Sequence, residues 1–163
     1  MLETNEADLR DLVSVNVMGP LLLARRLLPE MISAARSEHR RCGLITVSST
    51  AAFLPVPKLA SYAASKSFLL SWTEALAAEL WHDPIGVLAL CPTATRSDFA
   101  RRSGFGSGIP GAQDPAHVAR KALAALGRRR TLVMGPIGSA IFSGPVLFRA
   151  AAAQMFRTVL PRR

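Results

Sequence analysis

The chain has 163 residues, of which 50% are apolar and 19% are charged, so it can bury one core and is not an intrinsically disordered protein. Two cysteines exclude a disulfide-stabilised scaffold, and neither has a second Cys or a His at the spacing of a zinc site. The formal net charge is +9, and the excess is C-terminal, because residues 96–163 hold 12 basic and 2 acidic side chains.

A basic C-terminal part suits nucleic acid, an anionic membrane surface, a phosphorylated cofactor or simple solubility. Its arginines are scattered among Ala and Leu without interleaved aromatic residues, so we expect no nucleic-acid partner, and a membrane surface is not favoured. Residues 1–15 are acidic and polar, unlike a signal peptide. Cys42 and Cys91 lie in apolar runs and are predicted to be buried free thiols, so we expect a cytoplasmic protein.

The first predicted element is a long helix over residues 4–35, capped by Thr4 or Asn5. Gly19-Pro20 interrupts it, because proline removes one backbone hydrogen bond and clashes with the carbonyl four residues back, which predicts a kink near Asn16. A charged loop follows, and residues 43–48 have the length and β-branched content of a buried strand.

Residues 51–58 contain two prolines and are predicted to be a loop, followed by a helix over 61–81 and a buried strand over 85–91. After a Gly-rich loop, Asp114-Pro115 begins a helix that ends at Gly127, and 131–134 form a short strand. An amphipathic helix over about 145–160 ends the chain. This alternation predicts an α/β fold with about three parallel strands and flanking helices, as a single incomplete domain over 1–163.

Two residues at the start of the helix over 61–81 carry candidate chemistry. Tyr62 and Lys66 are four residues apart and so share a helical face, where an ammonium group can lower the pKa of a phenol and make it a general acid-base. Ser48 and Ser49 follow the first strand, at the sheet edge where open α/β folds bind ligands. The plainer alternatives are a solvated helix face for the pair and a turn or helix cap for the serines.

Four segments together resemble the classical short-chain dehydrogenases/reductases, which are NAD(P)-dependent oxidoreductases with a Rossmann fold. The segments are 15–20 (Val-Asn-Val-Met-Gly-Pro), 43–49 (Gly-Leu-Ile-Thr-Val-Ser-Ser), 62–66 (Tyr-Ala-Ala-Ser-Lys) and 91–99 (Cys-Pro-Thr-Ala-Thr-Arg-Ser-Asp-Phe). The resemblance implies that Tyr62 is the acid-base and that Lys66 lowers its pKa and binds the nicotinamide ribose. It also implies that Ser49 orients the carbonyl and that Asn16 organises a relay water.

The resemblance further implies NAD or NADP as cofactor, contacted by Tyr62, Lys66 and a loop through Pro92, Thr93, Thr95 and Ser97. Two features depart from the family pattern. Thr93 stands where the family has glycine, and a β-branched residue resists the backbone shape or close approach that glycine permits. The Gly-rich turn that binds the cofactor pyrophosphate has no counterpart in these 163 residues, and the choice between NAD and NADP cannot be read.

The implied function is hydride transfer between the nicotinamide cofactor and a small carbonyl or alcohol substrate. Residues 96–115 would form a substrate-side loop, 136–163 a C-terminal loop and helix, and the helices over 4–35 and 61–81 a homo-oligomer contact. The alternative is a truncated, inactive remnant that acts only through oligomer contacts with intact relatives. The first strand lacks one neighbour in this arrangement and is predicted to be a site of association.

Overall fold

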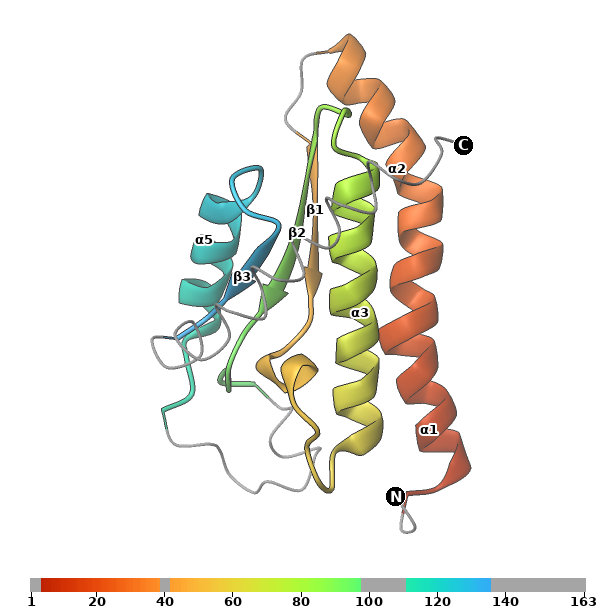
Figure 1. Cartoon of the computed structure of the whole chain (residues 1–163), viewed down its shortest axis with the longest axis vertical. Coiled ribbons are helices and arrows are strands. Elements are labelled where there is room, and N and C mark those ends of the chain that lie inside the picture. Colours follow the sequence, from red (N-terminus) through yellow and green to blue (C-terminus); the bar gives the residue numbers. More distant parts are fainter. Residues whose placement is uncertain (1–3, 39–41, 98–110, 136–163) are drawn as a thin grey trace.

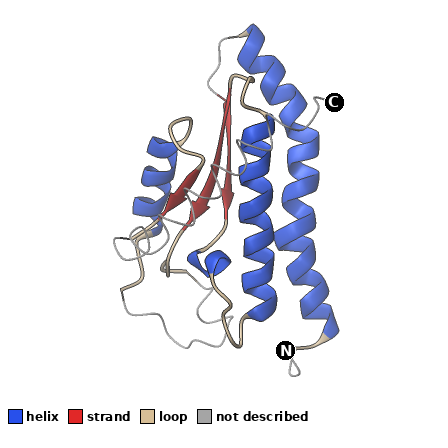
Figure 2. Cartoon of the chain, viewed as in Figure 1, coloured by secondary structure: helices blue, strands red, loops and turns tan. Residues whose placement is uncertain are grey.

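The computed structural model describes residues 4–38, 42–97 and 111–135 (Figure 1). Three parallel strands form one sheet in the order β1-β2-β3, with β1 at Cys42–Val47, β2 at Ile85–Cys91 and β3 at Thr131–Val133. A pair of long helices covers one face of the sheet and the shorter helix α5 covers the other, so the fold has three layers (Figure 2). The predicted α/β class with three parallel strands and flanking helices is confirmed, whereas the predicted C-terminal helix and most of the substrate-side loop lie outside the described residues.

The N-terminal helix is continuous but changes its winding. It comprises α1 (Glu6–Val13), the π-helical turn η1 (Ser14–Met18) and α2 (Gly19–Ser37). The Asn5 side chain caps it by accepting a hydrogen bond from the Asp8 N–H at 2.8 Å. The π turn includes Asn16, four residues before Pro20, because that proline cannot donate the hydrogen bond that an α-helix would require. The sequence predicted a kink near Asn16, and the structure has a π-helical turn at that position.

The second long helix, α3 (Ala60–Glu79), follows a short helical turn that the sequence did not indicate. Thr50–Phe53 form the 3₁₀ helix η2 inside the segment predicted to be a loop, and the prolines lie just beyond it. The buried side chains of α3 are Ala63, Ser65, Leu69, Leu70, Thr73, Glu74, Ala77 and Ala78. They face both the sheet and the N-terminal helix, because Leu70 packs with Ala89 and Cys91 of β2 whereas Ser65 bonds to Asn16. Phe68 lies on the outward side of α3 and is 39% exposed.

The central strand β2 carries the core on both of its faces. Leu88 and Leu90 pack with α5 (Pro115–Ala125), whereas Ala89 and Cys91 pack with Leu70 of α3. This split follows from the alternation of side chains along a strand. Cys91 is buried as predicted, but Cys42 at the start of the edge strand is only half-buried.

Buried polar groups tie the layers together. The hydroxyls of Thr46 in β1 and Thr73 in α3 lie 2.7 Å apart, and Thr131 at the start of β3 donates to the buried Glu74 carboxylate at 2.7 Å. These two bonds join α3 to the outer strands β1 and β3. They also satisfy polar side chains whose burial would otherwise cost free energy.

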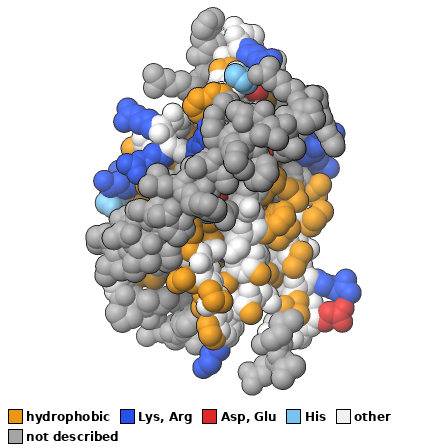
Figure 3. Space-filling model, viewed as in Figure 1, with side chains coloured by type: hydrophobic (Ala, Val, Ile, Leu, Met, Phe, Trp, Pro, Cys, Tyr) orange, Lys and Arg blue, Asp and Glu red, His pale blue; other side chains and the backbone are white. Residues whose placement is uncertain are grey.

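Several apolar side chains of the N-terminal helix are exposed to solvent. They gather on the α1–α2 side of the molecule in Figure 3, and the most exposed are Val13, Val15, Leu22, Leu23 and Leu27. Among the described helices, the run Glu6–Ser37 is long and apolar enough in composition to cross a membrane, a property that core helices of soluble proteins share.

Candidate functional site

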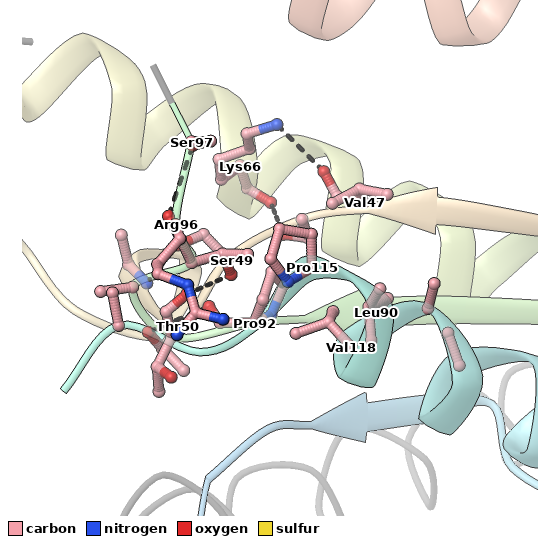
Figure 4. A pocket seen from close by; sticks show the side chains of 18 of the residues that line it. Val47, Ser49, Thr50, Lys66, Leu90, Pro92, Arg96, Ser97, Pro115 and Val118 are labelled. Carbon is pink, nitrogen blue, oxygen red and sulfur yellow. Dashed lines mark hydrogen bonds between the residues drawn. The ribbon is translucent and has the colours of Figure 1, made fainter. Parts of the chain in front are cut away.

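An open cleft of about 1090 Å³ lies at the carboxyl ends of β1 and β2 (Figure 4). The predicted catalytic residues Ser49, Tyr62 and Lys66 line it, and so do the four predicted cofactor contacts in the loop after β2. Asn16 does not line it. The topology thus brings together segments that are more than 40 residues apart, as expected for an open α/β sheet.

Ser49 is placed by the turn that follows β1. It caps η2, and its hydroxyl oxygen accepts a hydrogen bond from the Ala51 N–H at 3.1 Å. The same hydroxyl is hydrogen-bonded to the side chain of Tyr62. Because the Ala51 bond uses a lone pair, the hydroxyl proton of Ser49 is free to point at the phenol oxygen.

Burial raises the pKa of Tyr62 above 10.0, and the hydrogen bond from Ser49 opposes this rise. The Lys66 ammonium lies 5.7 Å from the centre of the Tyr62 ring and donates to the Val47 carbonyl at 3.0 Å. Burial lowers the pKa of Lys66 itself. The ammonium group of Lys66 is held at the strand end in this structure, so the lowering of the Tyr62 pKa by Lys66 that the sequence suggested stays a prediction.

Ser48 fixes the backbone of the same helix. Its hydroxyl donates to the Lys66 carbonyl at 2.7 Å, its N–H donates to the Leu90 carbonyl at 2.7 Å, and only 2% of the residue is exposed. Of the two roles that the sequence left open for Ser48, the structure supports the structural one. Lys66 is therefore tied to the end of β1 twice, through its own carbonyl and through its ammonium group.

Asn16 is linked to the backbone of Tyr62 through the Ser65 hydroxyl. Its side-chain amide donates to the Ser65 hydroxyl at 3.0 Å, and that hydroxyl donates to the Tyr62 carbonyl at 2.8 Å. Ser65 is 5% exposed. The sequence offered no signal for this role of Ser65 beyond its position inside the Tyr62–Lys66 segment. Asn16 and Lys66 both line a smaller groove between α2 and β1.

The loop after β2 is held by main-chain bonds. The Pro92 carbonyl accepts from the Thr50 N–H at 3.0 Å, and Gln113 bonds to both sides of Thr95, donating to the Ala94 carbonyl at 2.8 Å and accepting from the Arg96 N–H at 2.9 Å. Gln113 thus clamps the predicted cofactor loop, a role that depends on a pairing between distant segments.

Thr93 fits its position without strain. Among the described residues other than glycine, only Lys58 has a positive φ, so Thr93 does not need the backbone freedom of the family's glycine. Its methyl group lies 3.5 Å from the point where Gly135 would carry a Cβ. The expected conflict between Thr93 and a bound cofactor is therefore limited to the Thr93 side chain, which lines the cleft.

The donor set of the cleft fits one end of a dinucleotide. Hydroxyl, phenol and ammonium groups of Ser49, Tyr62 and Lys66 suit a carbonyl substrate and the ribose beside a nicotinamide, with the Pro92–Ser97 loop alongside. A site for the pyrophosphate would need a Gly-rich turn between a strand and a helix, which this sequence does not contain.

Comparisons with known proteins agree with this geometry. A family model described as short chain dehydrogenase matches residues 1–105. The very-long-chain 3-oxoacyl-CoA reductase of Kluyveromyces lactis is 35% identical over 130 residues, which are 78% of this chain and 36% of that protein. The protein of the same name from Eremothecium gossypii is 37% identical over 131 residues, with the same coverage of both chains. The chain spans about a third of the length of these relatives.

Solved structures share the fold. A short-chain dehydrogenase from Sphingobium yanoikuyae in complex with NADPH superposes with a TM-score of 0.76 at 22% identity, over 99% of this chain and 61% of that one. The 3-ketoacyl-(acyl-carrier-protein) reductase from Brucella melitensis, complexed with NADH, has a TM-score of 0.66 at 28% identity, over 81% of this chain and 58% of that one.

Proposed function

We propose that this chain, which belongs to the short-chain dehydrogenase family, carries the catalytic part of an NAD(P)-dependent oxidoreductase that interconverts a carbonyl and an alcohol. One observation carries the proposal: the hydrogen-bonded side chains of Ser49 and Tyr62 lie in one cleft with Lys66, at the carboxyl ends of the strands. This arrangement places two hydroxyl groups where both can bind a single carbonyl oxygen.

In the reductive direction, Ser49 and Tyr62 would hold the substrate carbonyl oxygen and polarise the C=O bond. A reduced nicotinamide bound beside them would supply the hydride that adds to the carbonyl carbon. Tyr62 would then give its proton to the developing alkoxide. Burial keeps the pKa of Tyr62 high, so the phenol carries that proton at neutral pH. In the reverse reaction the Tyr62 phenolate would accept the proton of the alcohol, so the same residues would serve both directions.

A 3-oxoacyl thioester is the substrate class that we propose. The support comes from two relatives, a 3-oxoacyl-CoA reductase and a 3-ketoacyl-(acyl-carrier-protein) reductase. The cleft also offers apolar side chains for an acyl chain, namely Leu59, Leu90, Pro115, Val118 and Leu123.

Tyr62, Lys66 and the Pro92–Ser97 loop would hold the nicotinamide end of the cofactor. We further propose that the protein is cytoplasmic and that it assembles through α1–α2 and the outward face of α3, where Phe68 is 39% exposed.

The test is a fluorescence titration of NADPH and NADH into the purified chain, followed by a turnover assay with a 3-oxoacyl thioester. We expect saturable binding, and we expect Tyr62→Phe to retain cofactor binding through Lys66 and the Pro92–Ser97 loop but to lower turnover by about 100-fold or more, because the hydroxyl that donates the proton is removed. A folded chain that binds neither cofactor would contradict the proposal and favour the inactive remnant. Turnover that Tyr62→Phe leaves unchanged would contradict the role of Tyr62.

A further inference from the structure

We propose that Arg96 binds the phosphate group of a reduced nicotinamide mononucleotide in the main cleft, so that these residues accept this half of the cofactor as a ligand in its own right. The proposal rests on the proposed function in one respect, because it takes the nicotinamide and its ribose to bind beside Tyr62 and Lys66. The sequence predicted cofactor contacts at Thr95 and Ser97, on either side of Arg96, and none at Arg96 itself.

The charged side chains of the cleft all have one sign. Among the described residues that line it, the charged ones are Lys66 and Arg96, and none is an aspartate or a glutamate. A cleft lined by positive charge attracts an anionic ligand. A carbonyl substrate and a ribose use hydroxyl and ammonium groups, whereas a phosphate gives the second cation a partner.

Arg96 has hydrogen-bond donors to spare. Its Nη2 donates to Asp114 Oδ1 at 3.1 Å, and within the described residues this is the one bond of its side chain. A guanidinium group carries five N–H donors in a planar fork, which matches two oxygens of a phosphate. The Arg96 side chain is 65% exposed, so the remaining donors are open to a ligand. Figure 4 shows Arg96 among the side chains of the cleft, together with Ser49 and Lys66.

The backbone at Arg96 is fixed. Its N–H donates to the Gln113 carbonyl at 2.9 Å, and the Gln113 N–H donates to the Ala94 carbonyl at 2.8 Å. Thr95, between these two bonds, thereby pairs with Gln113 as an isolated β-bridge. The loop therefore holds the base of the Arg96 side chain in place before a ligand arrives, which reduces the entropy lost on binding.

Asp114 holds Arg96 in a bond that a phosphate can replace. The ion pair is exposed on both sides, and exposed pairs contribute little free energy. Asp114 Oδ2 accepts from the His117 N–H at 3.1 Å and caps α5, so the carboxylate keeps a partner when Arg96 turns away. A phosphate offers Arg96 stronger, two-pronged hydrogen bonds in exchange.

The two cations of the cleft fit one nucleotide. Lys66 lies at the strand end near Tyr62, where we propose that the ribose binds, and Arg96 lies in the loop after β2. In a nicotinamide mononucleotide the phosphate is attached to that same ribose. In a phosphopantetheine thioester, which also carries a phosphate, a long flexible arm separates the phosphate from the carbonyl. Because both cations line one cleft, the mononucleotide is the source of phosphate that we propose.

The experiment compares reduced nicotinamide mononucleotide with reduced nicotinamide riboside, which differ only in the phosphate. Each is titrated into the purified chain, and binding is followed by the fluorescence of the nicotinamide ring. We expect the mononucleotide to bind about tenfold or more tightly than the riboside, because its phosphate forms charge-assisted hydrogen bonds. NADH should bind about as tightly as the mononucleotide. A far tighter NADH complex would show that these residues also hold the adenosine half, and would overturn the claim that one nucleotide suffices.

Arg96→Gln should weaken binding of the mononucleotide by about tenfold or more and leave binding of the riboside unchanged. Arg120→Gln is the matched control, because it removes the same charge from an exposed position of α5 that does not line the cleft. Asp114→Asn keeps a capping side chain but removes the competing carboxylate, so the mononucleotide should bind at least as tightly as before. If Arg96→Gln does not fold, salt replaces it as the test. Added salt should weaken binding of the mononucleotide to the unmodified chain and leave binding of the riboside unchanged.

Equal affinity of the unmodified chain for the mononucleotide and the riboside would overturn the phosphate site. A preference that Arg96→Gln leaves intact, or that Arg120→Gln also removes, would overturn the role of Arg96. If Arg96→Gln weakened binding of a 3-oxoacyl phosphopantetheine thioester and not of the mononucleotide, the phosphate would belong to the substrate, and the proposal would be wrong. A preference for the mononucleotide without turnover would uphold the phosphate site while the proposed function fails. Turnover with NADH that Arg96→Gln leaves unchanged, without that preference, would do the reverse.

Discussion

Asn16 and Ser65 are joined by a 3.0 Å hydrogen bond between two helices, although they lie 49 residues apart in the sequence. The Ser65 hydroxyl in turn donates a hydrogen bond to the Tyr62 carbonyl at 2.8 Å. The π turn of one helix is thereby connected to the first turn of the next, where the proposed acid-base stands.

Replacing Ser65 should destabilise the chain more than replacing Asn16. Ser65→Ala removes both part-buried hydrogen bonds of the hydroxyl, the one from the Asn16 amide and the one to the Tyr62 carbonyl, which should cost about 1–3 kcal/mol in the free energy of unfolding, measured in urea. Asn16→Ala removes one bond and should cost about 1 kcal/mol. The double variant should lose less than the two single losses combined, and strict additivity would show that the residues do not interact.

Tyr62 is the only tyrosine, so the ultraviolet absorbance of its phenolate reports its ionisation without interference. We expect a pKa above 10.0 in the folded chain, and Ser49→Ala should raise the pKa further, because the hydrogen bond that favours the phenolate is lost. Lys66→Met should leave the Tyr62 pKa nearly unchanged in the isolated chain. A clear rise in that variant would mean that the ammonium already acts on the phenol.

The same group makes folding stability depend on pH. The unfolded chain releases the Tyr62 proton near pH 10, whereas the folded chain retains it to higher pH, so the folded state binds more protons in that interval. Tyr62 should therefore make the free energy of unfolding fall as pH rises above 10, while the lowered pKa of Lys66 acts in the opposite direction. Tyr62→Phe should flatten this part of the curve, and an unchanged slope would assign the effect to other groups.

Gly43 and Gly86 face each other in register on β1 and β2, and both leave room for Leu126. An added Cβ at Gly86 would lie 3.0 Å from the Gly127 nitrogen, so Gly86→Ala should cost about 1–3 kcal/mol in a thermal or urea melt. At Gly43 the nearest atoms all belong to the Leu126 side chain. Leu126→Ala should therefore offset the added cost of Gly43→Ala but should relieve Gly86→Ala only in part.

Thr93→Gly should strengthen cofactor binding. The Thr93 side chain lines the cleft, and the backbone conformation at this position is open to glycine and threonine alike. Removing it opens room beside the Pro92–Ser97 loop, so we expect a lower Kd for NADPH in the fluorescence titration. Thr93→Ser is the control, because it keeps a hydroxyl and removes only the methyl group. A Kd that rises in the glycine variant would show that Thr93 contributes a favourable contact.

Much of the fold follows from local signals in the sequence. Strand β2 begins at Ile85 and ends at Cys91 as predicted, and Asp114 caps α5 by accepting from the His117 N–H at 3.1 Å. Pro20 predicted the disturbance at Asn16 because a missing N–H has a local consequence. These features depend on residues that are close together in the chain.

The remaining features depend on contacts between distant segments. Ser49 and Tyr62 line one cleft, in agreement with the sheet edge that the sequence predicted for the site. The hydrogen-bond partner of Lys66 is a main-chain carbonyl, and no pattern of residue types predicts such a partner. The sequence also did not predict which side of α3 is buried, because a helix this rich in alanine is apolar on nearly every face. The roles of Ser65 and Gln113 likewise appear only once the strands and helices are packed.

The π turn accommodates one extra residue within the N-terminal helix. Gly19 donates to the Ser14 carbonyl five residues back, where an α-helix would reach back four, so the turn holds one more residue than an α-helical one. In a regular α-helix, one residue corresponds to about 100° of rotation about the helix axis. A single deletion within Ser14–Met18 would thus restore an α-helical turn and keep α1 and α2 in phase, whereas a single deletion elsewhere in the helix would rotate one part against the other by about 100°. The number of residues in this helix and its rotational phase are therefore separate properties.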